Sequence, residues 1–165
     1  MIVVSDSSPL IALARIGQLN LLAELYRRIL IPPEVHHEVT VTGHGLPGAE
    51  QVRSAAWIEV VEVRSPADPC IERASRSLGA GERGAILLAK SANADLTLLD
   101  ESKARRVAQD AGLSVVGCIG LLEAAWRNGI VPDLRQAYTD LLRQGIRLDL
   151  KLLQASLAKL ELTGL

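Results

Sequence analysis

The stretch MIVVSDSSPLIALARIG, residues 1–17, decides the fold because it passes from strand to helix without a loop. Its branched apolar residues run up to Asp6, which predicts a buried strand that stops at an acid. Ser8 is a favourable helix cap and Pro9 suits the first helical position, so we expect a helix to begin at once. Gly17 is expected to interrupt that helix. A buried strand that leads directly into a helix is typical of an α/β protein.

Strands and helices continue to alternate along the chain. Short apolar runs predict strands, and the segments between them have the patterns and caps of helices. The expected strands are 29–32, 57–63, 94–100 and 113–117, and the expected helices are 18–28, 33–40, 49–55, 68–79, 82–93, 101–112, 119–129, 132–145 and 149–161. Because strands separated by helices form parallel sheets, we predict an α/β fold of three layers, with helices on both faces of a central parallel sheet. The alternating pattern of 57–63 places that strand nearer the sheet edge.

The chain has 165 residues, which suits one domain with a substantial core. We expect residues 1–131 to form this domain and the helices of 132–165 to pack on it as part of the same unit. No run approaches the length of a membrane span, and the amino-terminal apolar run is too short for a signal peptide, so a cytoplasmic protein is expected. Cys70 and Cys118 lack a metal-ligand spacing and are expected to be reduced, buried thiols.

The composition argues against two classes of nucleic-acid-binding protein. Aromatic residues are only 2% of the chain, too few for the stacking surface of an RRM or OB fold. Lys and Arg number 18 against 19 Asp and Glu, a formal net charge of −1. A protein that coats nucleic acid nonspecifically is usually basic instead.

The string GAGERG, residues 79–84, matches the glycine pattern of dinucleotide-binding loops. Such a loop follows a strand, whereas the residues before Gly79 look helical, and Glu82 would repel a pyrophosphate. We therefore expect no nucleotide cofactor. The alternative is that the glycines end one helix and turn the chain into the next. Glu82 then complements the helix dipole, is projected toward the strand ends, or does both, because the two interpretations are compatible.

Several acids lie at element boundaries: Asp6, Glu38, Glu82, Asp100 and Glu101. Any one of them alone is typically a cap or a solvated turn residue. Carboxylates gathered at one end of a sheet repel one another unless a cation or proton intervenes. Oxygen ligands without a His or Cys motif favour Mg²⁺ or Mn²⁺ over zinc.

Five segments, in sequential order, resemble the PIN-domain family and, more narrowly, its bacterial and archaeal branch of VapC-like proteins. They are VVSDSSPLIALARIGQLNLLAELY, ILIPPEVHHEV, GAGERGAILLAK, LTLLDESKARRVA and VVGCIGLLEAAWRNGIV. The resemblance spans roughly residues 2 to 131 and is specific because the motifs occur together. It implies an α/β/α sandwich that acts as a metal-dependent ribonuclease, often the toxin of a toxin–antitoxin pair, whose products carry a 5′-phosphate and a 3′-hydroxyl.

The resemblance also assigns roles to residues. The catalytic quartet maps to Asp6, Glu38, Glu82 and Asp100, with Glu101 as an auxiliary acid and Ser7 as the residue that orients ligands. We expect Asp6, Glu82 and Asp100, together with Glu101, to hold Mg²⁺ or Mn²⁺. The chain departs from the family pattern at Cys118, where a threonine is usual, and this places a hydroxyl contact there in doubt.

Basic residues near these acids are candidate phosphate contacts. They are Arg15, Arg83, Lys103, Arg105 and Arg106, although some of them are expected to be solvated helix-face charges. Setting aside the five site acids leaves 14 acids against 18 bases, so the remaining surface is able to attract RNA. The expected partners are RNA, an antitoxin protein and a second copy in a homodimer.

Other interpretations were weighed. Haloacid-dehalogenase-like enzymes and receiver domains need a second acid after the first strand, where this chain has Ser7 and Ser8. A catalytically silent PIN-like domain that only binds RNA or protein remains the alternative function. His36, His37 and His44 are expected at the surface or in caps. The leucine stripe of the last helix (Leu150, Leu153, Leu157 and Leu160) is expected to pack on the domain, with a dimer seam or antitoxin seat as alternatives.

Overall fold

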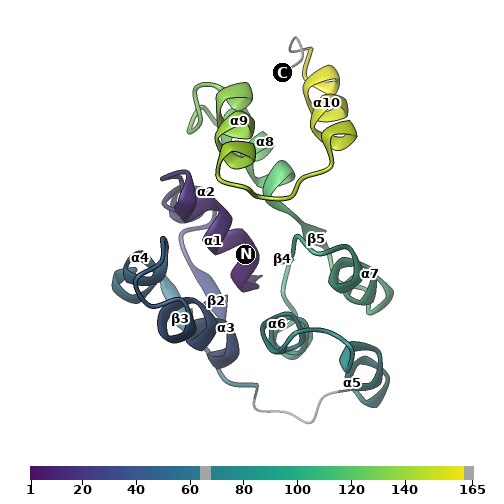
Figure 1. The fold of residues 1–165 in the computed structure, drawn as a ribbon. Helices are drawn as coiled ribbons and strands as arrows, with labels where there is room; N and C mark the ends of the chain where they lie inside the picture. Colours follow the sequence, from purple (N-terminus) through teal and green to yellow (C-terminus); the bar gives the residue numbers. More distant parts are fainter. Residues whose placement is uncertain (64–67, 162–165) are drawn as a thin grey trace.

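A computed structural model describes residues 1–63 and 68–161 and shows a five-stranded parallel sheet (Figure 1). The strands are β1 (Val3–Ser5), β2 (Ile29–Ile31), β3 (Ile58–Val60), β4 (Leu96–Leu98) and β5 (Val115–Val116). Their order across the sheet is β3-β2-β1-β4-β5, and every pairing is parallel. The predicted α/β fold is confirmed, and β3 lies at a sheet edge as expected.

Helices separate the strands. They are α1 (Ser7–Arg15), α2 (Leu21–Tyr26), α3 (Pro33–His37), the π-helical turn η1 (Glu38–Thr42), α4 (Ala49–Ser54), α5 (Pro69–Ser75), α6 (Ala80–Ser91), α7 (Ser102–Asp110), α8 (Cys118–Arg127), α9 (Leu134–Arg143) and α10 (Leu150–Lys159). None of the helices in the described part of the chain is long and apolar enough to cross a membrane.

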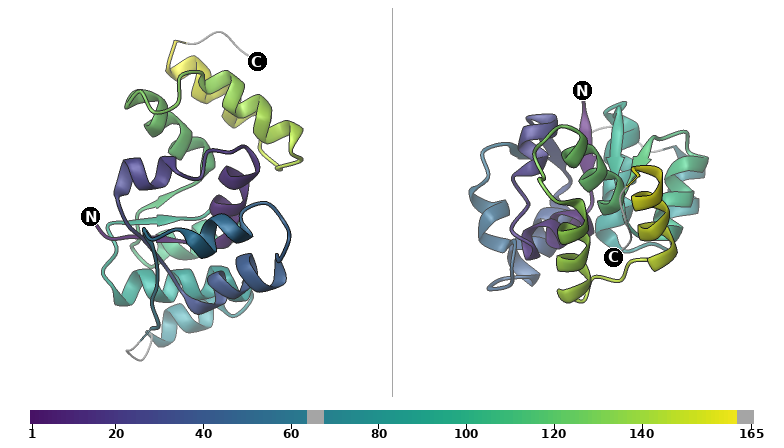
Figure 2. Two further views of the ribbon diagram at one scale, coloured as in Figure 1. Left: turned by 90° about the vertical axis from the view of Figure 1, so that its left-hand side faces the viewer. Right: turned by 90° about the horizontal axis from the view of Figure 1, so that it is seen from above.

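The two faces of the sheet bury separate hydrophobic clusters, because successive residues of a strand point to opposite sides. Val3 and Leu98 join the cluster under α1, α2 and α8, whereas Val4 and Leu99 join the cluster under α6 and α7. Helices therefore cover both faces of the sheet, and the further views of Figure 2 show this arrangement. The three-layer sandwich follows from this division.

The chain changes direction across the sheet beside β1. After β1 it builds β2 and β3 on one side, and then it returns to add β4 and β5 on the other side. The Asp6 N–H donates to the Leu98 carbonyl at 3.0 Å, so the residue that follows β1 is tied to the end of β4. Open parallel sheets carry their sites at such a switch point, beyond the carboxyl ends of the strands.

The last helices share the core of the sheet. Leu153 and Leu157 of α10 are fully buried in the cluster that contains α1 and α8. The Tyr138 hydroxyl on α9 lies 2.7 Å from Ser156 Oγ on α10, and Lys159 Nζ lies 3.7 Å from Glu123 on α8. Figure 1 shows α8, α9 and α10 together at one end of the molecule. Residues 162–165 of the expected C-terminal region lie outside the described residues.

Three local expectations were wrong. The cap of α1 is Asp6, not Ser8, because the Asp6 carboxylate accepts the Ser8 N–H and the helix begins one residue after the strand. The helix expected over 33–40 changes to a π-helical turn at Glu38. Cys70 is exposed, whereas Cys118 is buried as expected.

Candidate active site

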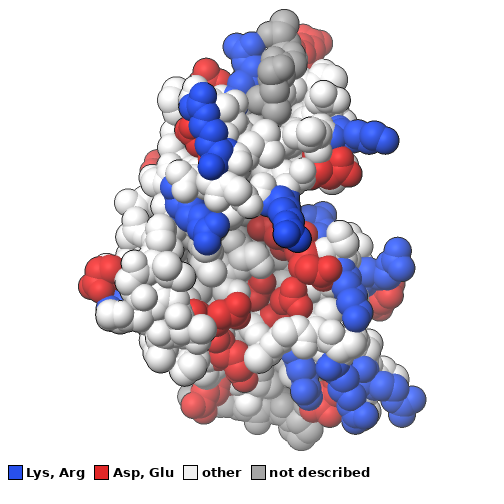
Figure 3. Space-filling view, in the orientation of Figure 1, with Lys and Arg blue, Asp and Glu red and all other residues white. Residues whose placement is uncertain are grey.

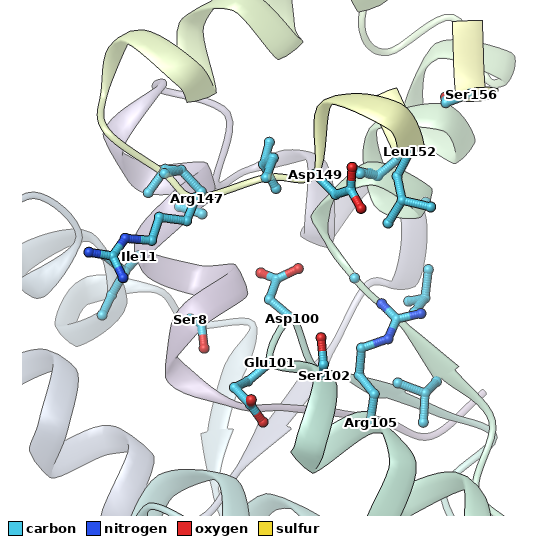
Figure 4. Close-up of a pocket in the computed structure, with 18 of the residues that line it drawn as sticks. Ser8, Ile11, Asp100, Glu101, Ser102, Arg105, Arg147, Asp149, Leu152 and Ser156 are labelled. Atoms are coloured by element: carbon cyan, nitrogen blue, oxygen red, sulfur yellow. The ribbon is translucent and has the colours of Figure 1, made fainter. Parts of the chain in front are cut away.

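A groove of about 950 Å³ opens at the carboxyl ends of β1, β4 and β5. Residues of α1, α7 and α8 form its floor and one side, and residues 145–159, which include α10, form the other side. Its polar and charged lining residues are Ser7, Ser8, Arg15, Glu38, Asp100, Glu101, Ser102, Arg105, Glu123, Arg147, Asp149, Ser156 and Lys159. Figure 4 shows Asp100, Glu101 and Arg105 below the groove and Arg147, Asp149 and Leu152 above it.

Asp6 is the most deeply buried acid of the site, with 1% of its surface exposed. Its Oδ2 accepts the Ser8 hydroxyl at 2.7 Å, and its Oδ1 accepts the Ser7 hydroxyl at 3.4 Å. Ser8 therefore makes the shorter contact, although the resemblance assigned the orienting role to Ser7. The motif D-S-S offered both hydroxyls, but the sequence alone could not tell which of them turns toward the acid.

Asp100 is held in place by the start of α8. Its Oδ1 accepts the Cys118 N–H at 2.7 Å, and its Oδ2 accepts the Cys118 thiol at 2.9 Å. Burial, followed by the charge and hydrogen bond of Asp100, raises the pKa of Cys118 well above its usual value, so the thiol stays protonated and can donate. Cys118 therefore supplies a side-chain donor to Asp100, at the position where the resemblance led us to expect a threonine.

Gly81 lies inside α6, at the point where that helix passes closest to the acids. A Cβ at this position would lie 2.6 Å from Glu38 Oε2 and 3.0 Å from Asp6 Oδ1. Oxygens of Asp6, which follows β1, and of Glu38 in η1 thus occupy the space where a side chain at position 81 would lie, and glycine leaves that space to them. The expectation that this glycine turns the chain was wrong, because it serves a close approach instead.

Glu82 and Glu101 are turned to the ends of their own helices. Glu82 accepts the Gly79 N–H at 2.9 Å, and Glu101 accepts the Ala104 N–H at 2.7 Å. Burial raises the pKa of Glu82, and the nearby charges of Asp6, Glu101 and Glu38 raise it further, against the lowering effect of the Gly79 N–H. Glu82 therefore caps α6 and also feels the field of the other acids. The contact with the helix start is the one that the structure shows, and Glu82 does not line the groove.

The acids suit a divalent cation in type but do not form a closed ligand set. Carboxylate oxygens are the ligands that Mg²⁺ and Mn²⁺ prefer. Within the described residues, no group of three or more His, Cys, Asp or Glu side chains is arranged to hold a metal ion. Asp6, Asp100, Glu82 and Glu101 each accept a local donor instead. The pKa of Glu82 is raised chiefly by burial and further by the charges of Asp6, Glu101 and Glu38, and a bound cation would offset those charges. Side-chain rotation, chiefly of the two glutamates, would be needed to bring their oxygens together.

The predicted basic residues divide into two groups. Arg15 and Arg105 line the groove, and each donates weakly to a carbonyl at 3.4 Å, of Gln144 and Leu99 respectively. Arg105 also lies beside Asp100, since both side chains would touch a Cβ at Gly117. Lys103, Arg83 and Arg106 do not line the groove. The surface shows acids gathered in a hollow, with Lys and Arg around its edge (Figure 3).

Sequence reasoning missed the residues that the C-terminal segment brings to the groove. Arg147, Asp149 and Lys159 line it, yet they lie far along the chain from every motif. Asp149 Oδ1 accepts the Lys151 N–H at 2.8 Å as the cap of α10. No local signal in the sequence indicated which face of the last helices would turn toward the acids.

The histidines do not join the acids as a group. His37 lines a second, smaller hollow of about 610 Å³, together with Glu34 and Glu38. His44 is exposed in the loop after η1. Glu38 lines both hollows, so it stands at the point where they meet. His37 and His44 are exposed, as predicted for surface residues, whereas His36 is half-buried.

The chain was also compared with known proteins. A family model described as a PIN domain matches residues 2–162, which covers almost the entire sequence and includes the C-terminal helices. The comparison with curated proteins gave no match. The family match agrees with the parallel sheet and with the place of the acids at its switch point. The chain therefore belongs to the PIN-domain family, whose members are generally nucleases that bind nucleic acid.

Proposed function

We propose that this protein is a Mg²⁺- or Mn²⁺-dependent endoribonuclease that hydrolyses phosphodiester bonds in its groove. The observation that carries the proposal is the approach of Asp6 and Glu38 oxygens to each other at Gly81. Glu82 is the next residue, and its pKa is raised first by burial and then by the charges of Asp6, Glu101 and Glu38. Carboxylates that repel one another at the switch point of a sheet destabilise the folded protein unless a bound cation offsets their charge. RNA as the substrate rests on the resemblance of the motifs.

The proposed site residues have three roles: they hold the metal ion, orient the attacking water and contact the phosphate. Asp6, Glu82, Asp100 and Glu101 would hold the ion, which when bound offsets charge at the scissile phosphate and activates the attacking water. Asp6 and Asp100 are fixed in orientation by Ser8 and Cys118. The Glu38 carboxylate, which is exposed and accepts no hydrogen bond within the described residues, is suited to orient the water. Arg105, which lies beside Asp100, would contact the phosphate.

Cleavage of a labelled, unstructured RNA tests the proposal. Wild type is expected to cut the RNA with Mn²⁺ or Mg²⁺ and to stop with EDTA, leaving 5′-phosphate and 3′-hydroxyl ends. Asp6→Asn should lower the rate by about 10³-fold, yet stay folded, because asparagine also caps helices well. Asp110→Asn is the matched control, since Asp110 is an exposed acid at the C-terminal end of α7 and is not among the acids that approach Gly81. Cleavage that persists in EDTA, or full activity of Asp6→Asn, contradicts the proposal.

Tight RNA binding without turnover under either ion would instead favour the silent, binding-only alternative. The VapC-like resemblance extends the proposal to the toxin of a type II toxin–antitoxin pair, with an antitoxin, a homodimer and a cytoplasmic location. These stay predictions. Growth arrest on induction of the wild type but not of Asp6→Asn tests the toxin role, and light scattering tests the dimer.

A further inference from the structure

The C-terminal segment forms a fixed wall of the groove. Residues 145–149 and one face of α10 line it, opposite Asp100 and Glu101 (Figure 4). The wall is anchored from behind by the buried side chains of Leu153 and Leu157 and by the pair of Tyr138 and Ser156. It is therefore positioned by packing and does not need to close over a substrate.

The side chains that this wall presents are an exposed cation and two apolar residues. Arg147 is exposed and makes no ion pair within the described residues. Leu152 keeps 58% of its surface exposed, and Leu148 is partly buried. The acid of this wall, Asp149, caps α10, and Glu123 on the facing helix α8 lies 3.7 Å from Lys159.

This combination suits an unpaired strand of RNA. A free guanidinium at the edge of an acidic hollow attracts a backbone phosphate, and such contacts position a strand without reading its sequence. Exposed leucines can pack against the face of a base only where the base is unstacked, which excludes a regular duplex. The described residues that line the groove include no aromatic side chain, so the base contact would be aliphatic.

We propose that residues 147–152 are an RNA-binding arm, in which Arg147 contacts a phosphate and Leu148 and Leu152 pack against the adjoining base. The proposal rests on the nuclease function proposed above, and it gives the C-terminal helices a role in substrate binding. In this proposal the groove binds single-stranded RNA, which passes between this arm and the strand-end acids.

Binding is measured separately from cleavage. The anisotropy of a fluorescent oligoribonucleotide of about 12 nucleotides, in EDTA, gives the affinity at roughly 50 and 200 mM salt. Arg147→Gln is expected to weaken binding five- to tenfold and to lower the log–log salt slope by about 0.7. Leu152→Ser, at an exposed position, should weaken binding about threefold without changing the slope. Arg127→Gln on α8 is the matched control for charge, because Arg127 is exposed outside the groove.

The outcomes separate this proposal from the nuclease function. If the wild type cuts RNA and Arg147→Gln has the same RNA affinity and KM, the proposed arm is overturned and the proposed nuclease function stands. Wild type that binds RNA through Arg147 but cuts under no divalent ion supports the arm and overturns the nuclease. Absence of RNA binding by the wild type, or equal competition by a duplex of the same sequence, overturns the arm as well.

Discussion

The two sides of the groove are built in opposite ways. On the strand-end side, acids follow the strands directly and are fixed by close contacts. Asp100, which lines the groove, is held by Cys118, and Asp6, which is buried behind the lining, is held by Ser8. On the C-terminal side, Arg147 and Leu152 are exposed and only the backs of the helices are fixed. This contrast suggests that the first side performs chemistry, which needs fixed geometry, and that the second side holds substrate, which tolerates adjustment.

The sharpest test of this contrast is a pair of glycine variants in α6. Gly81→Ala places a methyl group 2.6 Å from Glu38 Oε2 and 3.0 Å from Asp6 Oδ1. The exposed Glu38 carboxylate can swing away, and the buried Asp6 has to shift by only a few tenths of an ångström. We expect activity to fall about 30-fold because the oxygens no longer meet, while stability changes by less than about 1 kcal/mol because alanine favours helices.

Gly84→Ala is the matched control on the same helix. Its methyl group would meet Glu34 Oε2 at 2.9 Å and the stiff Pro32 ring at 3.1 Å. We expect it to lose about 1–3 kcal/mol of stability in denaturant unfolding and to keep most of its activity. Equal loss of activity in both variants would mean that packing, and not the meeting of the acids, decides the rate.

The thiol of Cys118 gives the next largest effect. Cys118→Ala removes the side-chain donor to Asp100 Oδ2 but keeps the backbone donor to Oδ1. We expect kcat to fall about tenfold with little change in KM, since a hydrogen bond to a charged group is worth about 1.5–3 kcal/mol. Cys118→Thr should restore most of the rate, and Cys70→Ala, at an exposed thiol, should have no effect. Failure of threonine to rescue would show that Cys118 acts only by filling space.

A smaller effect is expected on the C-terminal side. Tyr138→Phe removes the hydroxyl that pairs with Ser156 and leaves a buried oxygen without its partner, at a cost of about 1 kcal/mol. Because this pair holds α10, we expect KM to rise about twofold while kcat stays constant. Tyr26→Phe on α2, outside the groove, should change neither constant. A drop in kcat for Tyr138→Phe would break the division between chemistry and binding.

The smallest effect concerns the charge on Glu82. Its pKa is raised in the folded protein, so the folded state holds the proton more tightly than the unfolded state, and stability falls as pH rises above 4.5 toward the folded value. Glu82→Gln keeps a cap for Gly79 and removes the charge. At pH 7.5 in EDTA, the free energy of unfolding of this variant should therefore exceed that of the wild type by about 0.5 kcal/mol, a small value because solvent screens the exposed charge. Near pH 4.5 the two free energies should be equal. Thermal unfolding at both pH values measures this, and a loss at pH 7.5 would contradict it.

Much of the strand-end side could be predicted from the sequence. Strands that alternate with helices predict a parallel sheet, and the carboxyl ends of its strands lie at one edge. The positions of Asp6 and Asp100, which follow two buried strands, could therefore be predicted. Glu82 and Glu101 followed as first-turn or cap positions of helices. The sequence left open which group donates a hydrogen bond to each acid. Ser7 and Ser8 are adjacent candidates for Asp6, and the N–H and the thiol of Cys118 are both candidates for Asp100.

The other side depends on tertiary packing that no local pattern encodes. Arg147 reaches the groove only because α10 folds back on α8 and α9. Lys103 and Arg105 are two residues apart on one helix, yet only Arg105 faces the groove, since helix faces differ by about 100° per residue. The role of Gly81 was also hidden, because a close approach involves residues from three separate segments.

Calorimetric titration with Mn²⁺ tests the central claim most directly, because it asks whether the strand-end acids bind a dication without asking for turnover. The account predicts that wild type and Asp110→Asn take up the ion with release of heat, and that Asp6→Asn loses at least about tenfold in affinity. Absence of uptake by the wild type, or equal uptake by Asp6→Asn, would show that these acids gather for some other reason.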